Sequence, residues 1–446
     1  MKRGKEIKNK FIIFLVIYLG IISIANAKEN YLYNSKYRYF KTSLKYEGNS
    51  LSSPNVADID GDNKIDLILI ATLDGNIYAW DNKGELYENY PVAIADEIRG
   101  KVHVIDINND RQKELVVATL SGYIIALSIS GEKLWTKYVG GRIIKGITVN
   151  DIDSDGKVEI LVPIASNRKG CLAIDAATGE EKWFFSSSGQ AVPPKVGDIN
   201  GDGKNEIICI DGKELYCINI QGKLLWKRSI GSDLNNTFWS CEPTLYDIDN
   251  DDKQEVIIVE NNRLIILNGK GREILNVSYG SSRYNRSINS PLVVDINRDG
   301  INDVVWVDGS NNIYAVSLNK RIVPGFPIYG ISVYGDHFHA TPIVLDLIKD
   351  DNMEIILTSM GGYIYFATYN RERKSFEIID SIRLPYFDSF KNNAMSVNSL
   401  AYDLDKDGDY EVLINHKGGV MVWDFPKKKS YGIFIEERKD IFKQGK

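Results

Sequence analysis

Aspartate and asparagine recur at fixed places in a nine-residue phrase that the chain repeats eight times. The phrase begins at Asp58, Asp106, Asp151, Asp198, Asp247, Asp295, Asp346 and Asp403, with successive starts 45 to 57 residues apart. Positions 1, 3, 5 and 9 carry oxygen-bearing side chains in almost every copy, and position 2 is always Ile or Leu. Carboxylates at alternate positions can turn toward one point, and Ca²⁺ takes six to eight oxygens at about 2.3 to 2.6 Å. The phrase therefore predicts calcium-binding loops.

The predicted ligands are the side chains at positions 1, 3, 5 and 9, and the carbonyl of position 7 can add an oxygen. They are Asp58, Asp60, Asp62, Asp66, Asp106, Asn108, Asp110, Glu114, Asp151, Asp153, Asp155, Glu159, Asp198, Asn200, Asp202, Glu206, Asp247, Asp249, Asp251, Glu255, Asp295, Asn297, Asp299, Asp303, Asp403, Asp405, Asp407 and Glu411. The seventh phrase has Ile348 at position 3 and so loses a ligand. We expect weak binding or an empty site there.

Crowding of acids is the physical reason to expect a cation. Two carboxylates ~4 Å apart repel by about 4 kcal/mol at an effective dielectric near 20, so four in one loop would open it without a counter-ion. Magnesium is less favoured, because it requires a strict octahedron and keeps several waters. The alternative for all eight phrases is a tight turn rich in Asp and Asn that holds no metal.

The segments around each phrase read as short strands. A short apolar stretch precedes the phrase, a β-rich run such as EILVPI follows it, and two more runs complete a unit, with no amphipathic helix. Four strands in a unit of this length match one blade of a β-propeller. We therefore predict an all-β, eight-bladed propeller of four-stranded antiparallel blades, with seven blades plus a vestigial unit as the alternative. The strand that closes the ring is either Arg38–Tyr46 or Tyr431–Glu436.

The first residues differ in composition from the rest. A lysine- and arginine-rich head precedes the apolar run Phe11–Ile24 and the small-x-small triplet Ala25–Ala27, a pattern typical of a secretory signal peptide. The run is shorter than the ~20 residues of a membrane span, and an uncleaved anchor is the alternative. We predict a signal peptide at 1–27, a linker at 28–36, the propeller at 37–436 and a tail at 437–446, in an exported protein.

The acidic phrase resembles the FG-GAP or VCBS repeats of bacterial extracellular proteins, and by extension the calcium-bearing blades of the integrin alpha-subunit propeller. The resemblance covers residues 50–425, although intact FG and GAP segments are missing. It implies that the acidic loop joins the first and second strands of each blade, where calcium would be structural.

A second resemblance lies in the segment Ala173–Trp183, AIDAATGEEKW, with Trp135 and Trp226 in comparable places. It looks like the tryptophan-docking repeat of quinoprotein propellers, whose pyrroloquinoline quinone commonly lies beside two adjacent cysteines. The four cysteines here are Cys171, Cys209, Cys217 and Cys241, none adjacent to another. We interpret the tryptophans as blade packing, and the cysteines as either small buried residues or, for Cys209 and Cys217, cross-strand neighbours.

A ligand surface is expected on the face opposite the acidic loops. Its candidate residues are Trp239, Tyr284, Arg286, Asn289, His337 and His339, and the alternative is that aromatic residues there plug the centre of the ring. Rings with amides suit a protein or glycan ligand. The net charge of −6 and the lack of a long basic tract give no indication of nucleic acid. We predict a non-enzymatic binding or adhesion module, with a propeller enzyme (polysaccharide lyase or quinoprotein) or an envelope assembly scaffold as alternatives.

Overall fold

The computed structural model describes most of the chain between residues 40 and 424. The described residues are 40–190, 192–211, 214–230, 241–260, 263–278, 289–331, 338, 340–347, 349–359, 361–383, 399–404, 406, 408, 410–416 and 418–424. The predicted signal peptide, linker and tail lie outside them. Within these residues the structure contains strands, and no helix long and apolar enough to cross a membrane.

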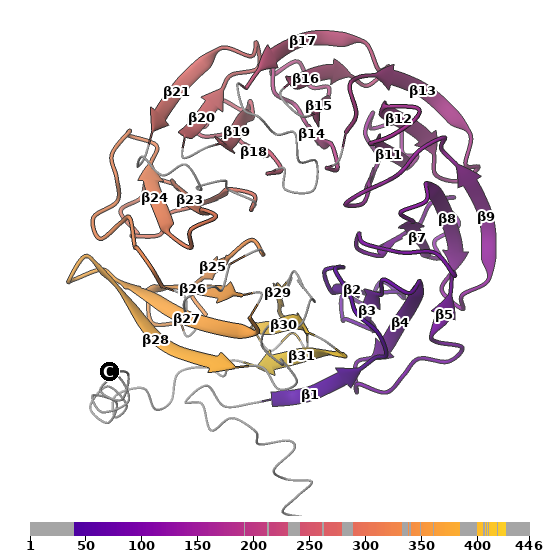
Figure 1. The fold of residues 1–446 in the computed structure, drawn as a ribbon, viewed down its shortest axis with the longest axis horizontal. Helices are drawn as coiled ribbons and strands as arrows, with labels where there is room; N and C mark the ends of the chain where they lie inside the picture. Colours follow the sequence, from indigo (N-terminus) through magenta and orange to yellow (C-terminus); the bar gives the residue numbers. More distant parts are fainter. Residues whose placement is uncertain are drawn as a thin grey trace, which may run out of the picture.

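The strands form eight antiparallel sheets arranged around a common axis (Figure 1). Blades 1 to 4 comprise β2 (Asn55–Ala57), β3 (Leu67–Ala71), β4 (Asn76–Asp81) and β5 (Val92–Ala93); β6 (His103–Ile105), β7 (Glu114–Ala118), β8 (Tyr123–Ser128) and β9 (Lys133–Tyr138); β10 (Thr148–Asn150), β11 (Glu159–Ile164), β12 (Gly170–Asp175) and β13 (Glu181–Ser186); β14 (Lys195–Gly197), β15 (Glu206–Asp211), β16 (Glu214–Asn219) and β17 (Leu224–Ser229).

Blades 5 to 8 complete the ring. They comprise β18 (Thr244–Tyr246), β19 (Glu255–Glu260), β20 (Arg263–Leu267) and β21 (Glu273–Ser278); β22 (Leu292–Val294), β23 (Asp303–Val307) and β24 (Ile313–Ser317); β25 (Ile343–Leu345), β26 (Met353–Thr358), β27 (Tyr363–Asn370) and β28 (Ser375–Arg383); β29 (Ser399–Tyr402), β30 (Glu411–His416), β31 (Gly419–Asp424) and β1 (Phe40–Lys45). The predicted eight-bladed propeller is confirmed, and the seven-bladed alternative is wrong.

The sixth blade differs at its outer edge. Its sheet has three strands, and two isolated bridges, Ile313 with Ile328 and Val316 with Ile322, stand where the fourth strand lies in other blades. Pro324 and Pro327 fall between the bridging residues 322 and 328. Because proline has no backbone N–H to donate, this segment follows the sheet without forming a regular ladder.

The N-terminal strand closes the ring. β1 pairs with β31 in blade 8, with Leu44 opposite Val420, so the closing strand is Phe40–Lys45, which lies within the first of the two predicted alternatives. The Tyr46 hydroxyl lies 2.7 Å from both Asn415 Oδ1 and the carbonyl oxygen of His416. The Asn415 side-chain amide in turn donates to the carbonyl of Ser52 at 3.0 Å. These buried polar contacts connect the last blade to the first.

The core consists of eight apolar clusters, one at each interface between neighbouring blades. In β15, Ile207 and Cys209 pack toward blade 3, whereas Ile208 and Ile210 pack toward blade 5. Side chains of a strand alternate between its two faces, so a strand buried on both sides is apolar at every position. This is why the second strand of each blade, which follows the acidic phrase, is continuously apolar in sequence.

Three tryptophans on outermost strands fix consecutive interfaces. The indole N–H groups of Trp135, Trp183 and Trp226 donate to carbonyls of the next blade at 3.1, 2.7 and 2.9 Å. The acceptors are Ala176, Ile220 and Gly269. The interpretation of these tryptophans as blade packing is confirmed, and blades 2 to 5 form an arc joined by the same contact.

Substitution of Gly222 tests this contact. Gly222 has a φ of 75°, and a Cβ there would lie 2.6 Å from the Trp183 ring, whereas Gly330 has a φ of 64° and a Cβ would meet nothing within 4 Å. Both Gly→Ala changes carry left-handed strain of about 1 to 2 kcal/mol, but only Gly222→Ala adds a clash of about 1 to 3 kcal/mol. We expect a clearly lower urea midpoint for Gly222→Ala than for Gly330→Ala; equal midpoints would contradict the docking contact.

Candidate metal centres

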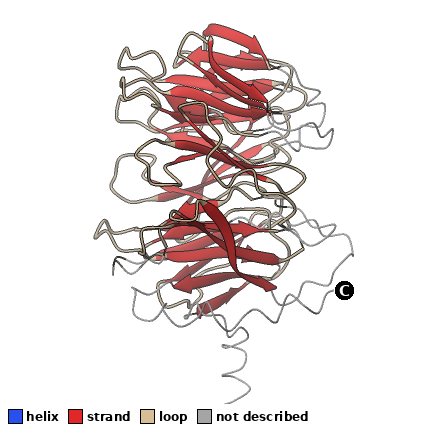
Figure 2. Ribbon diagram, turned by 90° about the vertical axis from the view of Figure 1, so that its left-hand side faces the viewer, coloured by secondary structure: helices blue, strands red, loops and turns tan. Residues whose placement is uncertain are grey.

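Every acidic phrase lies between the first and second strands of a blade. In blade 1 the phrase follows β2 and ends just before β3, and in blades 2 to 8 position 9 is the first or second residue of the second strand. The placement that the FG-GAP resemblance implied for this loop is therefore found in all eight blades. In side view the strands of the ring lie between two layers of loops (Figure 2).

Two positions of each loop adopt a left-handed backbone. The φ angles of positions 4 and 6 lie between 52° and 88° in all eight loops. These residues are Gly61, Asn109, Ser154, Gly201, Asn250, Arg298, Lys349 and Lys406 at position 4, and Asn63, Arg111, Gly156, Gly203, Asp252, Gly300, Asp351 and Gly408 at position 6. Gly and Asn adopt this conformation at low cost, which explains their frequency there. The alternating backbone turns the intervening amides inward.

The inward amides bind the carboxylates of positions 1 and 5. In the first loop Asp58 accepts the N–H groups of Gly61 and Asn63 at 2.7 and 2.8 Å, and Asp62 accepts that of Lys64 at 2.7 Å. The fourth loop repeats this around Asp198, which accepts from Gly201 and Gly203 at 2.6 and 2.8 Å. Backbone dipoles therefore offset part of the acid repulsion in the loops.

The acid at position 9 closes each loop on the side of the core, through a hydrogen bond with position 2. In all eight loops one of its oxygens accepts the backbone N–H of position 2 at 2.6 to 3.1 Å. Seven of these acids are at most 5% exposed: Glu114, Glu159, Glu206, Glu255, Asp303, Glu354 and Glu411. The apolar residue at position 2 is thus constant because its side chain enters the core while its amide holds position 9.

Burial makes the position 9 acids hard to ionise. Desolvation raises the pKa of Glu114, Glu206 and Glu255, and nearby acids at positions 1 and 5 raise it further. The same causes, with the N–H of Ile296 opposing them, raise the pKa of Asp303 to about 7. A bound cation would reverse this trend, since an adjacent positive charge stabilises the ionised carboxylate.

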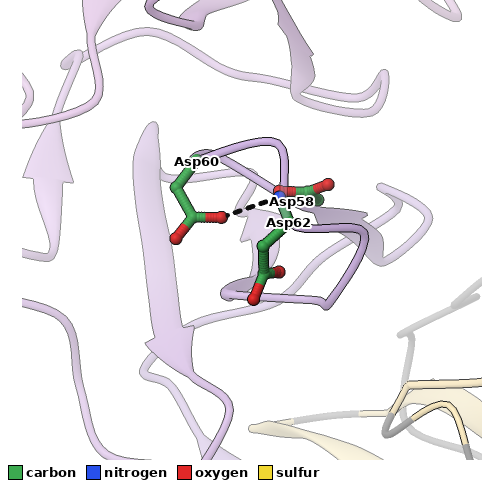
Figure 3. A group of neighbouring side chains, drawn as sticks. All are labelled: Asp58, Asp60 and Asp62. Carbon is green, nitrogen blue, oxygen red and sulfur yellow. Dashed lines mark hydrogen bonds between the residues drawn. The ribbon is translucent and has the colours of Figure 1, made fainter.

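Among the described residues, four loops bring three carboxylates together within 4.8 Å of one another. The groups are Asp58, Asp60 and Asp62; Asp151, Asp153 and Glu159; Asp247, Asp249 and Asp251; and Asp346, Asp350 and Glu354. In the first loop the side chains of Asp58, Asp60 and Asp62 surround one turn, and Asp60 accepts the N–H of Asp62 at 3.0 Å (Figure 3). Convergent carboxylate oxygens are the donor set that Ca²⁺ prefers, so these residues fit the predicted ion.

The seventh loop brings together the three acids that its sequence places at positions 1, 5 and 9. Although Ile348 offers no side-chain oxygen, Asp346, Asp350 and Glu354 converge within 4.8 Å. In the eighth loop Asp405 and Asp407 lie outside the described residues, and Asp403 Oδ1 is a buried oxygen that accepts no hydrogen bond in the described part of the chain.

Asparagine replaces the acid at position 3 in the second, fourth and sixth loops. The Asn108 side-chain amide donates to Asp110 at 3.1 Å, and that of Asn200 donates to Glu206 at 2.6 Å. In the sixth loop Asn297 Oδ1 accepts the N–H of Asp299 at 2.9 Å. In the second and fourth loops an amide therefore relieves part of the repulsion, while the amide oxygen remains available as a ligand.

Neighbouring loops are hydrogen-bonded to one another. The Asn109 amide of the second loop donates to the carbonyl of Gly156 in the third at 2.8 Å. The Asn205 amide of the fourth loop donates back to the carbonyl of Ile152 at 3.1 Å, and the Lys113 ammonium of the second loop binds the carbonyl of Asp58 in the first. The first four loops are thus connected to one another along this rim.

The opposite face is described in part. Of the predicted ligand residues, Trp239, Tyr284, Arg286, His337 and His339 lie outside the described residues. Asn289 is buried, and its amide donates to the carbonyl of Phe338 at 3.4 Å. Phe338 is 1% exposed and packs edge-on against Tyr365, so this aromatic residue belongs to the core.

Sequence reasoning missed a group of lysines near the ring axis. Lys101, Lys145 and Lys195 stand at the starts of the innermost strands of blades 2, 3 and 4, and Lys195 Nζ lies 2.8 Å from Glu242 Oε2. Burial lowers the pKa of Lys101 and Lys145, and the Lys195 charge lowers both further. The three lysines stand five, six and three residues before Asp106, Asp151 and Asp198, so no common position in the repeat marked them as a set.

The cysteines are structural. All four are buried and none forms a disulfide, which confirms the prediction of small buried residues. Cys209 lies opposite Tyr216 and Cys217 opposite Ile208, so the predicted cross-strand cysteine pair is wrong by one residue.

Comparisons with known proteins identify a family. A model of the PQQ-like repeats, described as outer membrane protein assembly factor BamB, matches residues 74–323, the part of the chain that contains the three docking tryptophans. The structure of BamB from Moraxella catarrhalis superposes with a TM-score of 0.59 at 15% identity, covering 88% of this chain and 99% of that chain. Quinohemoprotein alcohol dehydrogenase from Comamonas testosteroni gives a TM-score of 0.57 at 11% identity, covering 88% and 77%. These structures share the fold.

A local similarity points elsewhere. Two curated relatives, the lambda-carrageenases of Pseudoalteromonas sp and Pseudoalteromonas carrageenovora, are each 31% identical to this chain over 113 residues. The aligned part is 25% of this chain and spans 12% of the length of those enzymes.

The pH dependence of stability tests the buried position 9 acids. With chelator present, the folded protein binds a proton at Asp303 more tightly than the unfolded chain does, because the folded pKa is about 7 and the ordinary value is 3.8. This proton stabilises the fold fully below pH 3.8, and its contribution is lost as the pH rises to about 7. Asn at this position still accepts the N–H of Ile296 but does not titrate. As the pH rises between these values, we expect the unfolding free energy of Asp303→Asn to increase relative to that of the wild type. A difference that does not change with pH would contradict the raised pKa of Asp303.

Proposed function

The chain belongs to the PQQ-like β-propeller family described as outer membrane protein assembly factor BamB, and from this membership we propose that it is an exported, calcium-stabilised scaffold that binds protein partners in the cell envelope. The family match is the observation that carries the proposal. The signal-peptide pattern of residues 1–27 supports export, and the acidic loops support the stabilising ions.

The outer wall of blades 2 to 5 supports a protein as the partner. Leu134, Tyr138, Leu225 and Ile274 lie on the outermost strands and are 47%, 51%, 48% and 39% exposed. The strands β9, β17 and β21 that carry them are the last of their sheets. Exposed apolar side chains along an unpaired strand edge favour an extended polypeptide, which can add a strand through backbone hydrogen bonds. Such a partner suits a protein that handles other chains during assembly.

The acidic rim has a supporting role in this proposal. Its loops connect the first two strands of each blade and are hydrogen-bonded across blade boundaries. Calcium in these loops would fix the blades in position, while the outer wall remains free to bind. Separating a stabilising rim from a binding wall allows binding without disturbing the ions.

Binding of an anionic glycan is the second candidate function. The 113-residue similarity to lambda-carrageenase favours it, as does the group formed by Lys101, Lys145 and Lys195 near the axis. Such a function would use the inner strands and leave the outer wall without a role.

Charge substitutions on the outer wall distinguish these functions. The probe is an unfolded outer-membrane β-barrel protein diluted from urea, with affinity measured by fluorescence anisotropy. Burying one leucine contributes about 1.5 to 3 kcal/mol, so we expect Leu225→Asp and Leu134→Asp to weaken binding about tenfold or more.

Tyr329→Asp is the matched control, because Tyr329 is 68% exposed on blade 6, outside the arc. It should leave the affinity unchanged, and all variants should melt like the wild type. If the wild type does not bind the probe, or if the three variants lose affinity equally, the outer wall is not the protein-binding surface. Binding of a carrageenan oligosaccharide that persists in Leu225→Asp would favour the second candidate.

A further inference from the structure

In the third and seventh loops, a basic side chain from another element contacts the acid group. Lys182 of β13 places its Nζ 2.6 Å from Glu159 Oε1 and 3.5 Å from Asp153 Oδ2. Arg298 of the sixth loop places its Nη2 2.7 Å from Asp346 Oδ2 in the seventh. In both cases the contacted acids belong to a group whose carboxylates lie within 4.8 Å of one another.

The first and fifth loops have a different arrangement. Their carboxylates pair with the position 7 lysines of the same loops, Lys64 on Asp62 and Lys253 on Asp251, and the Lys113 ammonium of the second loop contacts the backbone carbonyl of Asp58 rather than its carboxylate. Both pairs are solvent-exposed, with the lysine side chains 67% and 42% accessible. Exposed lysines move away at little cost, so they leave the acids of these loops open to an ion.

We infer that Lys182 and Arg298 are built-in cations that take the place of the divalent ion in the third and seventh loops, and that the ions are confined to the other loops. The inference rests on the proposed binding of calcium and specifies which loops take part. It differs from a ranking of calcium affinity by the number of acids in each loop, because that ranking makes the third loop equal to the first and fifth.

The position of each cation supports this assignment. The Lys182 nitrogen is as close to Glu159 as a calcium ion would be to its oxygen ligands, about 2.3 to 2.6 Å. Glu159 is fully buried, so its charge has no access to water and requires a partner inside the protein. An ion and an ammonium group at the same carboxylates would repel each other, so the two exclude one another.

Arg298 is held in place by its surroundings. Its φ of 52° is the left-handed value shared by position 4 of every loop, and its carbonyl accepts a hydrogen bond from Arg371 Nη2 at 2.9 Å. These contacts hold its backbone, and its guanidinium reaches from the sixth loop to Asp346 in the seventh. It meets the loop in which Ile348 has removed an oxygen ligand, so the fixed cation occurs where an ion would be held least well.

Counting bound ions in purified variants tests the inference. Calcium per chain is measured by elemental analysis after dialysis, together with calorimetric titration of chelated protein. We expect Arg298→Ser and Lys182→Ser each to bind one more calcium than the wild type, and the double variant two more. Lys64→Ser is the matched control and should bind the same number as the wild type.

A variant that adds a basic side chain tests the inference independently, in case the serine variants fail to fold. Asn250 occupies position 4 of the fifth loop with a φ of 58°, close to that of Arg298, so Asn250→Arg should direct a guanidinium toward the sixth loop. It should bind one calcium fewer than the wild type.

The outcomes separate the inference from the function on which it rests. If the wild type binds calcium but neither Arg298→Ser nor Lys182→Ser gains an ion, and Asn250→Arg loses none, the inference is wrong and the calcium proposal stands. If the folded wild type and all variants bind no calcium, both fail together.

Discussion

The repulsion among carboxylates crowded into one turn is the constraint on which the ring depends. Each blade begins with a very short inner strand, and the chain must reverse within the acidic loop before the long second strand starts. In the loop, backbone N–H groups donate hydrogen bonds to the carboxylates of positions 1 and 5. The acid of position 9 is buried and accepts the backbone N–H of position 2. Hydrogen bonds alone leave several buried carboxylates with raised pKa values, and an adjacent positive charge would favour their ionised form.

Two separate sets of polar contacts join the blades, one on the acidic rim and one on the outer strands. Loops on one rim join neighbouring blades through polar contacts, while Trp135, Trp183 and Trp226 join the outer strands of blades 2 to 5. The apolar clusters between blades fill the space between these two sets of contacts. A propeller held at both places presents a fixed outer surface, which favours recognition of a partner over conformational change.

The repeat made much of this fold predictable from sequence. Eight acidic phrases at a near-constant spacing favoured eight blades over seven, and the unassigned strand before Asp58 was a natural partner for the last sheet. The contacts of Lys182 and Arg298 with the acid groups were not predictable, because both side chains reach acids that are distant in sequence from them. The short outer edge of blade 6 depends on prolines whose effect is visible only once the register is known. The lysines near the axis escaped notice because they come from three different blades.

The melting temperature of the purified protein with and without divalent ions tests the account most directly. Purified protein, analysed for bound metal, is unfolded thermally in calcium, in EDTA, and in EDTA followed by excess calcium. Ions that bind the folded chain alone add about 2.7 kcal/mol per site at a hundredfold excess over Kd. The account predicts several bound calcium ions and a reversible fall of at least about 5 °C in EDTA. A protein that carries no divalent ion and melts at the same temperature in all three conditions would contradict it.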